Sequence, residues 1–262
     1  MIWPERSIPG PIDGYLAAGT WTSDAIEAAL TPGQILLTGG YREAPAPHGA
    51  FAPDGKAYFN SLVAVRRDAG GLTRLATYDK HRLVPFGEYL PLDRYLQPLG
   101  IHELVHVGEG FSAGPPPQAI TLDGAPPVQP LICYESLYPD FTRQGMRRSG
   151  LAPQWIVNVS DDAWFGPTSG PLQHLNLAAY RAIEAGVPVV RATPTGVSAI
   201  IDAYGRIAPG QSLGEGRMGI IDARLPPALP PTPFDRVGES SFAAMLLVTF
   251  AAFVFVRWRR AR

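Results

Sequence analysis

Cysteine is nearly absent from this chain of 262 residues, which contains Cys133 and no other. A single cysteine excludes an intramolecular disulfide, so cysteine content does not indicate the cellular compartment. The chain also lacks an excess of charge, because its formal net charge is −1 and no basic stripe with interleaved aromatic residues occurs. Nucleic acid is therefore not an expected partner. The sequence shows no internal repeat, and its first residues do not have the charged and then apolar pattern of a signal peptide.

Apolar residues, by contrast, are plentiful. They make up 46% of the chain, and charged residues make up 17%, so a substantial core can be buried. The length fits one large domain or two small ones.

The longest apolar run lies near the C-terminus. Residues 240–256 carry no charge, and only two serines and a threonine interrupt the apolar side chains. This run is at the short limit for a membrane span, which is roughly 17–25 residues. Residues 257–262 are basic and include Trp258, a pattern typical of the cytoplasmic side of a span. We expect a transmembrane helix at 240–256 and a cytoplasmic tail at 257–262, with a buried core helix or an amphipathic anchor as alternatives.

The rest of the chain alternates between two kinds of periodicity. Apolar and β-branched runs predict strands at Gln34–Gly40, Ala57–Val65, Trp155–Ser160, Val187–Arg191, Val197–Asp202 and Arg206–Ala208. Helical spacing predicts helices at Thr22–Leu30, Tyr138–Gly145 and Leu172–Ala185. This alternation indicates an α/β domain over residues 1–224, whose sheets are covered on both faces. The proline-dense stretch 225–239 is expected to be a linker.

Cys133 ends an apolar stretch and precedes a polar segment that predicts the start of a helix. Most lone cysteines are small buried residues without a chemical role, so the neighbouring residues must decide whether this thiol reacts. Glu5 and Lys80, like Cys133, fall at predicted strand ends, the edge where α/β folds gather functional groups. A thiol that attacks an acyl carbonyl needs a base, which a carboxylate can supply, and a cation stabilises the resulting oxyanion.

Each of these residues also has a plain structural interpretation. Glu5 could cap a helix, Lys80 could be a solvated surface charge, and Glu88 could simply pair with Lys80 or Arg82. Spacing alone does not choose between these interpretations and a catalytic triad.

The local sequences around these residues form a longer set of motifs. They are Trp3-Pro4-Glu5, Tyr78-Asp79-Lys80, Leu83 to Tyr89, Ile132 to Glu135, Asn158 to Gly166, Arg181 to Glu184, and Arg191 to Gly196. With these motifs the chain resembles the nitrilase, or carbon–nitrogen hydrolase, superfamily, which uses a Glu-Lys-Cys triad. More narrowly, it is similar to the apolipoprotein N-acyltransferase family. Soluble amidases as a rule lack the stretch Val84 to Tyr89, the segment Asp161 to Gly166 and a terminal membrane helix.

The resemblance implies an α-β-β-α sandwich, incomplete at its N-terminus, followed by one C-terminal transmembrane helix. It implies that Glu5 is the general base and that Cys133 carries the acyl group as a thioester. Lys80 would stabilise the oxyanion, together with a backbone N–H after Cys133.

Three further residues match supporting positions of the family. Glu88 would hold the lysine, and Tyr134 and Glu135 would support the nucleophile loop. The implied reaction takes an acyl chain from a membrane phospholipid and passes it to the N-terminal diacylglyceryl-cysteine of an apolipoprotein. It needs no metal and no cofactor. The implied location is the bacterial inner membrane, with the catalytic domain on the periplasmic side.

The chain departs from the family pattern at its start. The family's multi-helix membrane domain and the first strand and helix of the sandwich are expected to be missing. We therefore expect a truncated product or a partial sequence, with a strand edge and one sheet face uncovered. Two alternative functions follow: a membrane-anchored amidase or nitrilase-type hydrolase, or an inactive remnant.

Apolar residues after Glu88 allow two interpretations, lipid-facing loops or an ordinary core helix. They are Tyr89, Leu90, Leu92, Tyr95, Leu96 and Leu99.

Overall fold

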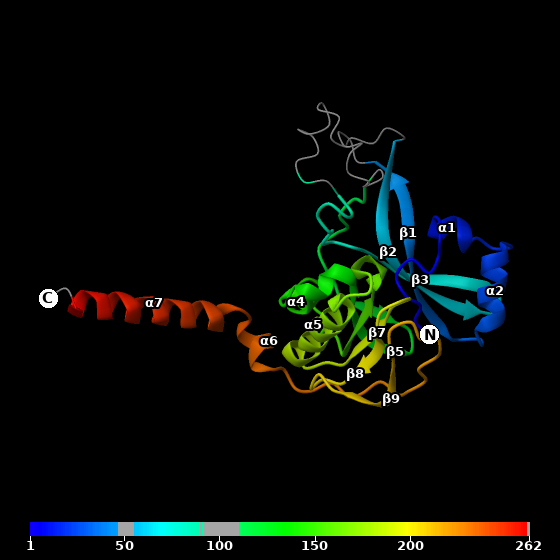
Figure 1. Cartoon of the computed structure of the whole chain (residues 1–262). Coiled ribbons are helices and arrows are strands. Elements are labelled where there is room, and N and C mark those ends of the chain that lie inside the picture. Colours follow the sequence, from blue (N-terminus) through cyan, green and yellow to red (C-terminus); the bar gives the residue numbers. More distant parts are fainter. Residues whose placement is uncertain (47–54, 90, 92–109, 261–262) are drawn as a thin grey trace.

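The computed structural model describes residues 1–46, 55–89, 91 and 110–260, as a layered α/β domain from which one long helix projects (Figure 1). Of the apolar residues after Glu88, Tyr89 is described and is partly exposed, whereas Leu90, Leu92, Tyr95, Leu96 and Leu99 lie outside the described residues.

The first sheet is an antiparallel meander of three strands. They are β1 (Ile35–Pro45), β2 (Lys56–Asp68) and β3 (Gly71–Asp79), in that order across the sheet. The predicted strands at 34–40 and 57–65 are confirmed, and both continue beyond their predicted ends. The sheet brings the C-terminal end of β3, which precedes Lys80, beside the middle of β2, where Ser61 pairs with Asp79.

The second sheet has six strands and a parallel centre. They are β4 (Ile120–Leu122), β5 (Ala125–Ile132), β6 (Trp155–Val159), β7 (Val189–Ala192), β8 (Ser198–Ile201) and β9 (Ile207–Leu213), in that order. Strands β5, β6 and β7 run parallel, so their carboxyl ends meet at one edge of the sheet. Cys133 follows β5 at this edge, and the segment from Ser160 to Asp162 follows β6.

Two pairs of helices cover the sheets. They are α1 (Ile12–Tyr15) and α2 (Trp21–Ala29) on the first sheet, and α4 (Phe141–Ser149) and α5 (Gly170–Ala185) on the second. One core cluster joins both sheets to α4 and α5, through residues such as Leu62, Ile132 and Ala182. A smaller cluster, which includes Ile26 and Val63, joins the first sheet to α1 and α2. The layers are therefore helix, sheet, sheet, helix.

The expected uncovered edge and face are not found at β1, although β3, β4 and β9 stand at sheet edges. Ile2 forms a parallel bridge with Leu37 of β1. The backbone N–H of Trp3 donates to the Leu37 carbonyl at 2.8 Å, and the Leu37 N–H donates to the Met1 carbonyl at 3.0 Å. Because α1 and α2 also pack on this sheet, the edge at Leu37 is paired and the outer face is covered.

The proline-dense stretch before the last helix packs on the domain. The backbone N–H of Leu229 donates to the Gly186 carbonyl at 2.7 Å, and the Thr232 hydroxyl donates to the carbonyl of Glu184. Residues of this stretch also form the short helix α6 (Pro233–Val237), which contacts α5. The stretch expected as a linker is thus partly helical and is attached to α5.

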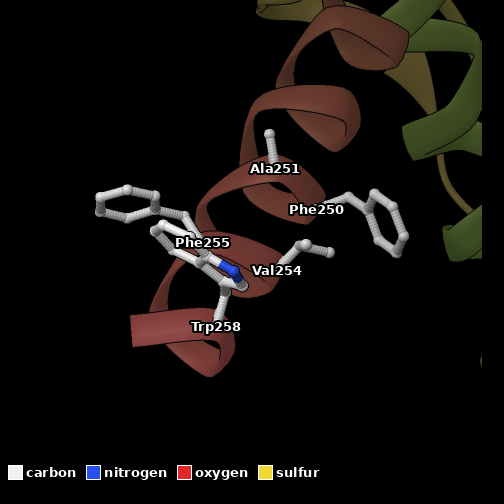
Figure 2. A pocket seen from close by; sticks show the side chains of 5 residues that line it. All are labelled: Phe250, Ala251, Val254, Phe255 and Trp258. Carbon is white, nitrogen blue, oxygen red and sulfur yellow. The ribbon is translucent and has the colours of Figure 1, made fainter. Parts of the chain in front are cut away.

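Helix α7 (Ser240–Arg260) follows and points away from the domain (Figure 1). The helix continues through the basic residues that were expected to form a tail. Phe250 and Phe255 project to different sides of the helix, and Trp258 lies beside Phe255 with ring centroids 6.4 Å apart (Figure 2). Length and composition make α7 a candidate membrane span, and none of its apolar window is buried against the rest of the protein.

Ile26 tests the packing of α2 on the first sheet. It is 1% exposed within the smaller core cluster, so Ile26→Ala should lower the free energy of unfolding by about 2–5 kcal/mol. Trp21 begins the same helix and is 84% exposed. Trp21→Ala should therefore change the free energy of unfolding by no more than about 0.5 kcal/mol. Urea unfolding in a mild detergent, followed by circular dichroism, measures both. Equal losses in the two variants would contradict this packing.

Candidate active site

Cys133 occupies a sharp turn at the end of β5. Its φ angle is +48°, a left-handed backbone conformation that non-glycine residues rarely adopt. The turn leads directly into a short 3-10 helix, Cys133–Leu137. Such strain persists only where surrounding contacts fix the backbone, and it is concentrated at functional sites. The thiol is thus presented at the end of a rigid strand.

The three residues predicted as a triad line one cavity of about 650 Å³. Lys80 Nζ lies 3.9 Å from Glu5 Oε1 and 2.8 Å from Glu88 Oε1. Lys80 is 1% exposed, so it is not a solvated surface charge. Cys133 and Tyr134 line the same cavity, at its boundary with the second sheet. The structure therefore brings together Glu5, Lys80, Glu88 and Cys133 from three separate segments of the chain.

Asn60 connects the two glutamates and was missed by the sequence analysis. Its Nδ2 donates to Glu5 Oε1 at 2.6 Å and to Glu88 Oε1 at 2.9 Å. The other Glu5 oxygen accepts the backbone N–H of Asp161 at 2.7 Å. Asn60 is a buried amide within the apolar run of β2, and that polar interruption is the signal that could have identified it.

Gly39 allows the segment of Glu5 to approach β1. A Cβ atom at this position would lie 2.6 Å from the Glu5 Cα, which is too close for any side chain. The contact fixes the backbone of Glu5 against the first sheet, although Glu5 is far from Lys80 and Cys133 in sequence.

Burial determines the protonation states of the triad. It raises the pKa of Glu5, and the charge of Lys80 opposes this effect. Burial, with the negative charge of Glu5, raises the pKa of the Cys133 thiol to about 12 against the opposing charge of Lys80. Burial alone would lower the pKa of Lys80, but the charges of Glu5, Cys133 and Glu88 outweigh it and raise the pKa. At neutral pH the resting site thus holds a neutral thiol and a cationic lysine.

Glu135 connects the turn that begins at Cys133, called the nucleophile turn, to the loop that carries Lys80. Its carboxylate accepts the backbone N–H groups of Ile132 at 2.8 Å and His81 at 2.7 Å, and the Tyr78 hydroxyl at 2.9 Å. The side chain is fully buried. Burial raises its pKa to about 7, although the backbone donors act in the opposite direction. Tyr134 lines the cavity, whereas Glu135 lies behind it, and the supporting roles of both residues stay predictions.

A second buried polar network lies behind the nucleophile turn, and the sequence analysis did not predict it. Arg191 Nη2 donates to both oxygens of Asp162, at 2.8 and 2.6 Å, and Arg191 also donates to Asn158. His174 Nδ1 lies 2.9 Å from Asp162 Oδ1. Asn158, Asp162 and Arg191 fall within the sequence motifs, whereas His174 lies outside them, and none of the four had a predicted role.

Apolar side chains form much of the remaining cavity wall. They include Val84, Phe111, Leu137, Trp164, Phe165 and Leu177. Trp164 is 69% exposed, so the wall continues onto the surface. The cavity thus combines a charged, reactive end with an apolar wall.

Comparison with known proteins places this site in a family. The chain matches the carbon–nitrogen hydrolase family over residues 1–229 and belongs to that family. It is 50% identical over 250 residues to the apolipoprotein N-acyltransferase of Caulobacter vibrioides, covering 95% of this chain and 45% of that protein. It is 42% identical to the apolipoprotein N-acyltransferase of Bradyrhizobium diazoefficiens, again covering 45% of that protein. The chain thus spans about half the length of these relatives.

Among solved structures, the chain resembles a cysteine-to-serine mutant of the Nesterenkonia AN1 amidase from the nitrilase superfamily. The TM-score is 0.51 at 17% sequence identity, and the match covers 94% of this chain and 83% of the amidase. This likeness shows a nitrilase-like α/β fold.

Glu135 should make stability depend on pH. Its pKa is raised from 4.5 to about 7 in the folded protein, so the folded state keeps a proton that the unfolded state loses. The free energy of unfolding should therefore fall as the pH rises from about 4.5 to about 7. The raised pKa of Glu5 also makes the free energy of unfolding fall as the pH rises. Urea unfolding over a series of pH values measures the slope.

Glu135→Gln removes the titrating group and should flatten this slope. Glu215→Gln is the matched control, because Glu215 is exposed. An unchanged slope in Glu135→Gln would show that Glu135 does not titrate in this window.

Proposed function

We propose that this chain carries the acyl-transfer site of a lipoprotein N-acyltransferase. The observation that carries the proposal is the cavity in which Glu5, Lys80 and Cys133 meet beside an apolar wall. The relatives named apolipoprotein N-acyltransferase support the same activity. The proposed donor is a membrane phospholipid, and the proposed acceptor is the N-terminal diacylglyceryl-cysteine of an apolipoprotein.

In the first half-reaction, Glu5 accepts the thiol proton while Cys133 Sγ attacks the ester carbonyl carbon of the phospholipid. The carbonyl π pair moves onto the oxygen, where Lys80 and a backbone N–H after Cys133 stabilise the charge. When the intermediate collapses, the ester C–O bond breaks and the lysophospholipid oxygen takes the proton from Glu5. The acyl chain is then held as a thioester on Cys133.

In the second half-reaction, the α-amino group of the acceptor attacks the thioester carbonyl. Glu5 accepts a proton from the attacking amine, and the C–S bond breaks. The thiolate takes up that proton, so the site returns to its starting state with an amide formed on the lipoprotein. The resting thiol has a raised pKa, so it must lose its proton as it attacks. A base is therefore needed at that moment, and Glu5 is the proposed base.

Glu88 holds Lys80 in this scheme. It accepts a hydrogen bond from Lys80 Nζ at 2.8 Å, and its second oxygen accepts the backbone N–H of Val84 at 2.8 Å. Its fixed negative charge keeps the lysine cationic beside the oxyanion. Glu135 fixes the turn that carries Cys133 through the N–H of Ile132.

Helix α7 is proposed to span the bacterial inner membrane. Its basic C-terminal turn would lie on the cytoplasmic side by the positive-inside rule, which puts the catalytic domain in the periplasm. The apolar cavity wall, which reaches the surface at Trp164, suits an acyl chain that would otherwise have to cross water. The lipid bilayer is thus both the anchor site and the source of the donor.

The two alternative functions, a hydrolase and an inactive remnant, differ from transfer in what happens to the acyl group. A hydrolase would pass it to water and release ammonia from small amides, and an inactive remnant would form no thioester. The high identity to N-acyltransferases favours transfer over hydrolysis.

The thioester is directly testable on the full chain. Incubation with phospholipid vesicles should add a long-chain acyl mass to Cys133, detected by intact-mass spectrometry, and Cys133→Ala should remove the adduct. Glu5→Gln and Lys80→Met should each slow its formation about 10²–10³-fold. Exposed Glu215→Gln is the control and should leave the rate unchanged. Ammonia release from small amides without an acyl adduct would favour the hydrolase, and an unmodified wild-type chain would refute acyl transfer.

The membrane arrangement has its own test. The full chain in bacterial cells should resist alkaline extraction from membranes, whereas a chain ending at residue 239 should be released. In spheroplasts, external protease should digest the catalytic domain, because we place it on the periplasmic side. Protection of that domain until the cells are lysed would reverse the orientation.

A further inference from the structure

Two buried side chains hold the backbone carbonyl of Cys133 from inside the domain. Ser136 Oγ donates to it at 3.0 Å, and His174 Nε2 lies 3.1 Å from it. Ser136 Oγ and His174 Nε2 are themselves 2.9 Å apart. Ser136 is 0% exposed and His174 is 3% exposed, so water does not compete for this carbonyl. The three polar atoms form a closed triangle behind the nucleophile turn.

His174 is oriented in turn by the network behind it. Its Nδ1 faces Asp162 Oδ1 at 2.9 Å, and Asp162 is held by Arg191. Burial raises the pKa of Asp162, but the hydrogen bond from His174 and the charge of Arg191 lower it to about 2, so the carboxylate is charged. A charged carboxylate only accepts hydrogen bonds, so Nδ1–H donates to Asp162, and the carbonyl of Cys133 likewise accepts from Nε2–H, so the proposed contact needs a hydrogen on both ring nitrogens. Phe165 packs edge-on against the imidazole, with ring centroids 5.6 Å apart.

Gly196 leaves the space that Asp162 occupies. A Cβ atom at Gly196 would overlap the Asp162 carboxylate, so no larger residue fits there without displacing it. The network therefore depends on packing as well as on hydrogen bonds, and it presents one fixed geometry to the nucleophile turn.

Fixing the Cys133 carbonyl also fixes the next N–H group. The carbonyl of Cys133 and the N–H of Tyr134 belong to one planar trans peptide, in which they point in opposite directions. The carbonyl points to the buried side chains of Ser136 and His174, so the N–H points away from them. Tyr134 and Cys133 both line the cavity. The strained φ of Cys133 makes this peptide costly to hold in place without such contacts.

We propose that His174, oriented by Asp162 and assisted by Ser136, is a positioning residue that aims the Tyr134 N–H at the oxyanion formed on Cys133. This inference rests on the proposed function, because it requires acylation of the thiol. His174 also borders the cavity, but in this proposal its role is exerted through the peptide that joins Cys133 to Tyr134.

Two reactions of the Cys133 thiol distinguish a loss of oxyanion stabilisation from an overall distortion of the site. A p-nitrophenyl ester acylates Cys133 through a tetrahedral oxyanion: the S–C bond forms, Glu5 takes the thiol proton, and p-nitrophenolate leaves with the C–O electron pair. Iodoacetamide alkylates the same sulfur by displacement of iodide, with loss of the thiol proton and without any oxyanion. Only the first reaction uses the Tyr134 N–H.

Both rates are measured on the full chain in detergent, by p-nitrophenolate release and by the mass of the alkylated protein. His174→Leu and Ser136→Ala should each slow acylation about tenfold, which corresponds to the loss of one aligned hydrogen bond. Alkylation should stay within about twofold of wild type. His174→Gln keeps an N–H donor near the Cys133 carbonyl and should recover part of the acylation rate. Tyr180→Phe is the control on the same helix, because Tyr180 is 48% exposed.

Several outcomes would overturn the proposal. The proposal is wrong if the acylation rate is unchanged in folded His174→Leu and Ser136→Ala. It is also wrong if the acylation and alkylation rates fall by the same factor. Melting temperatures check folding, and if His174→Leu does not fold, the smaller change Ser136→Ala decides alone. A wild-type chain that is alkylated but never acylated would refute the proposed function itself, and the inference with it. Acylation of wild type with unaffected variants would refute only the inference.

Discussion

The site depends on the mutual compensation of charges that have been removed from water. Lys80 is buried with Glu5 and Glu88, and Asn60 donates to both glutamates. An isolated ion in such surroundings is costly, whereas a cluster in which each charge has a partner is tolerated. The first sheet supplies Asn60 and leads to Lys80, while the packing of Met1 to Trp3 on β1 places Glu5. The arrangement of strands around this cluster therefore determines the chemistry of the cavity.

Much of the fold could be predicted because several strands are continuous apolar runs. β6 is buried along its whole length, and its prediction is confirmed at both ends within one residue. β3 was not predicted, because it lies at the edge of its sheet and most of its residues are partly exposed, so it has no apolar run. β5 contains three prolines, which normally argue against an internal strand, and only its end at Cys133 was inferred.

The residues proposed as catalytic were predictable from motifs, but their hydrogen-bond partners were not. Glu5, Lys80 and Cys133 each stand in a recognisable local sequence, whereas Asn60 is a single amide inside a strand whose partners lie 55 and 28 residues away. His174 occupies a helix whose periodicity indicates core packing. Its contacts with Asp162 and with the Cys133 carbonyl follow from the meeting of β6, α5 and the nucleophile turn. Such long-range meetings leave no periodic signal in the sequence.

The protonated state of the resting nucleophile has a consequence for its chemical durability. Oxidants and disulfides react with thiolates far faster than with thiols. Burial and the negative charge of Glu5 raise the pKa of Cys133 to about 12, so the resting thiol is protonated. With no second cysteine in the chain, Cys133 also has no internal partner for a disulfide. The same burial and charge that raise the pKa of the thiol thus also lower its reactivity towards oxidants.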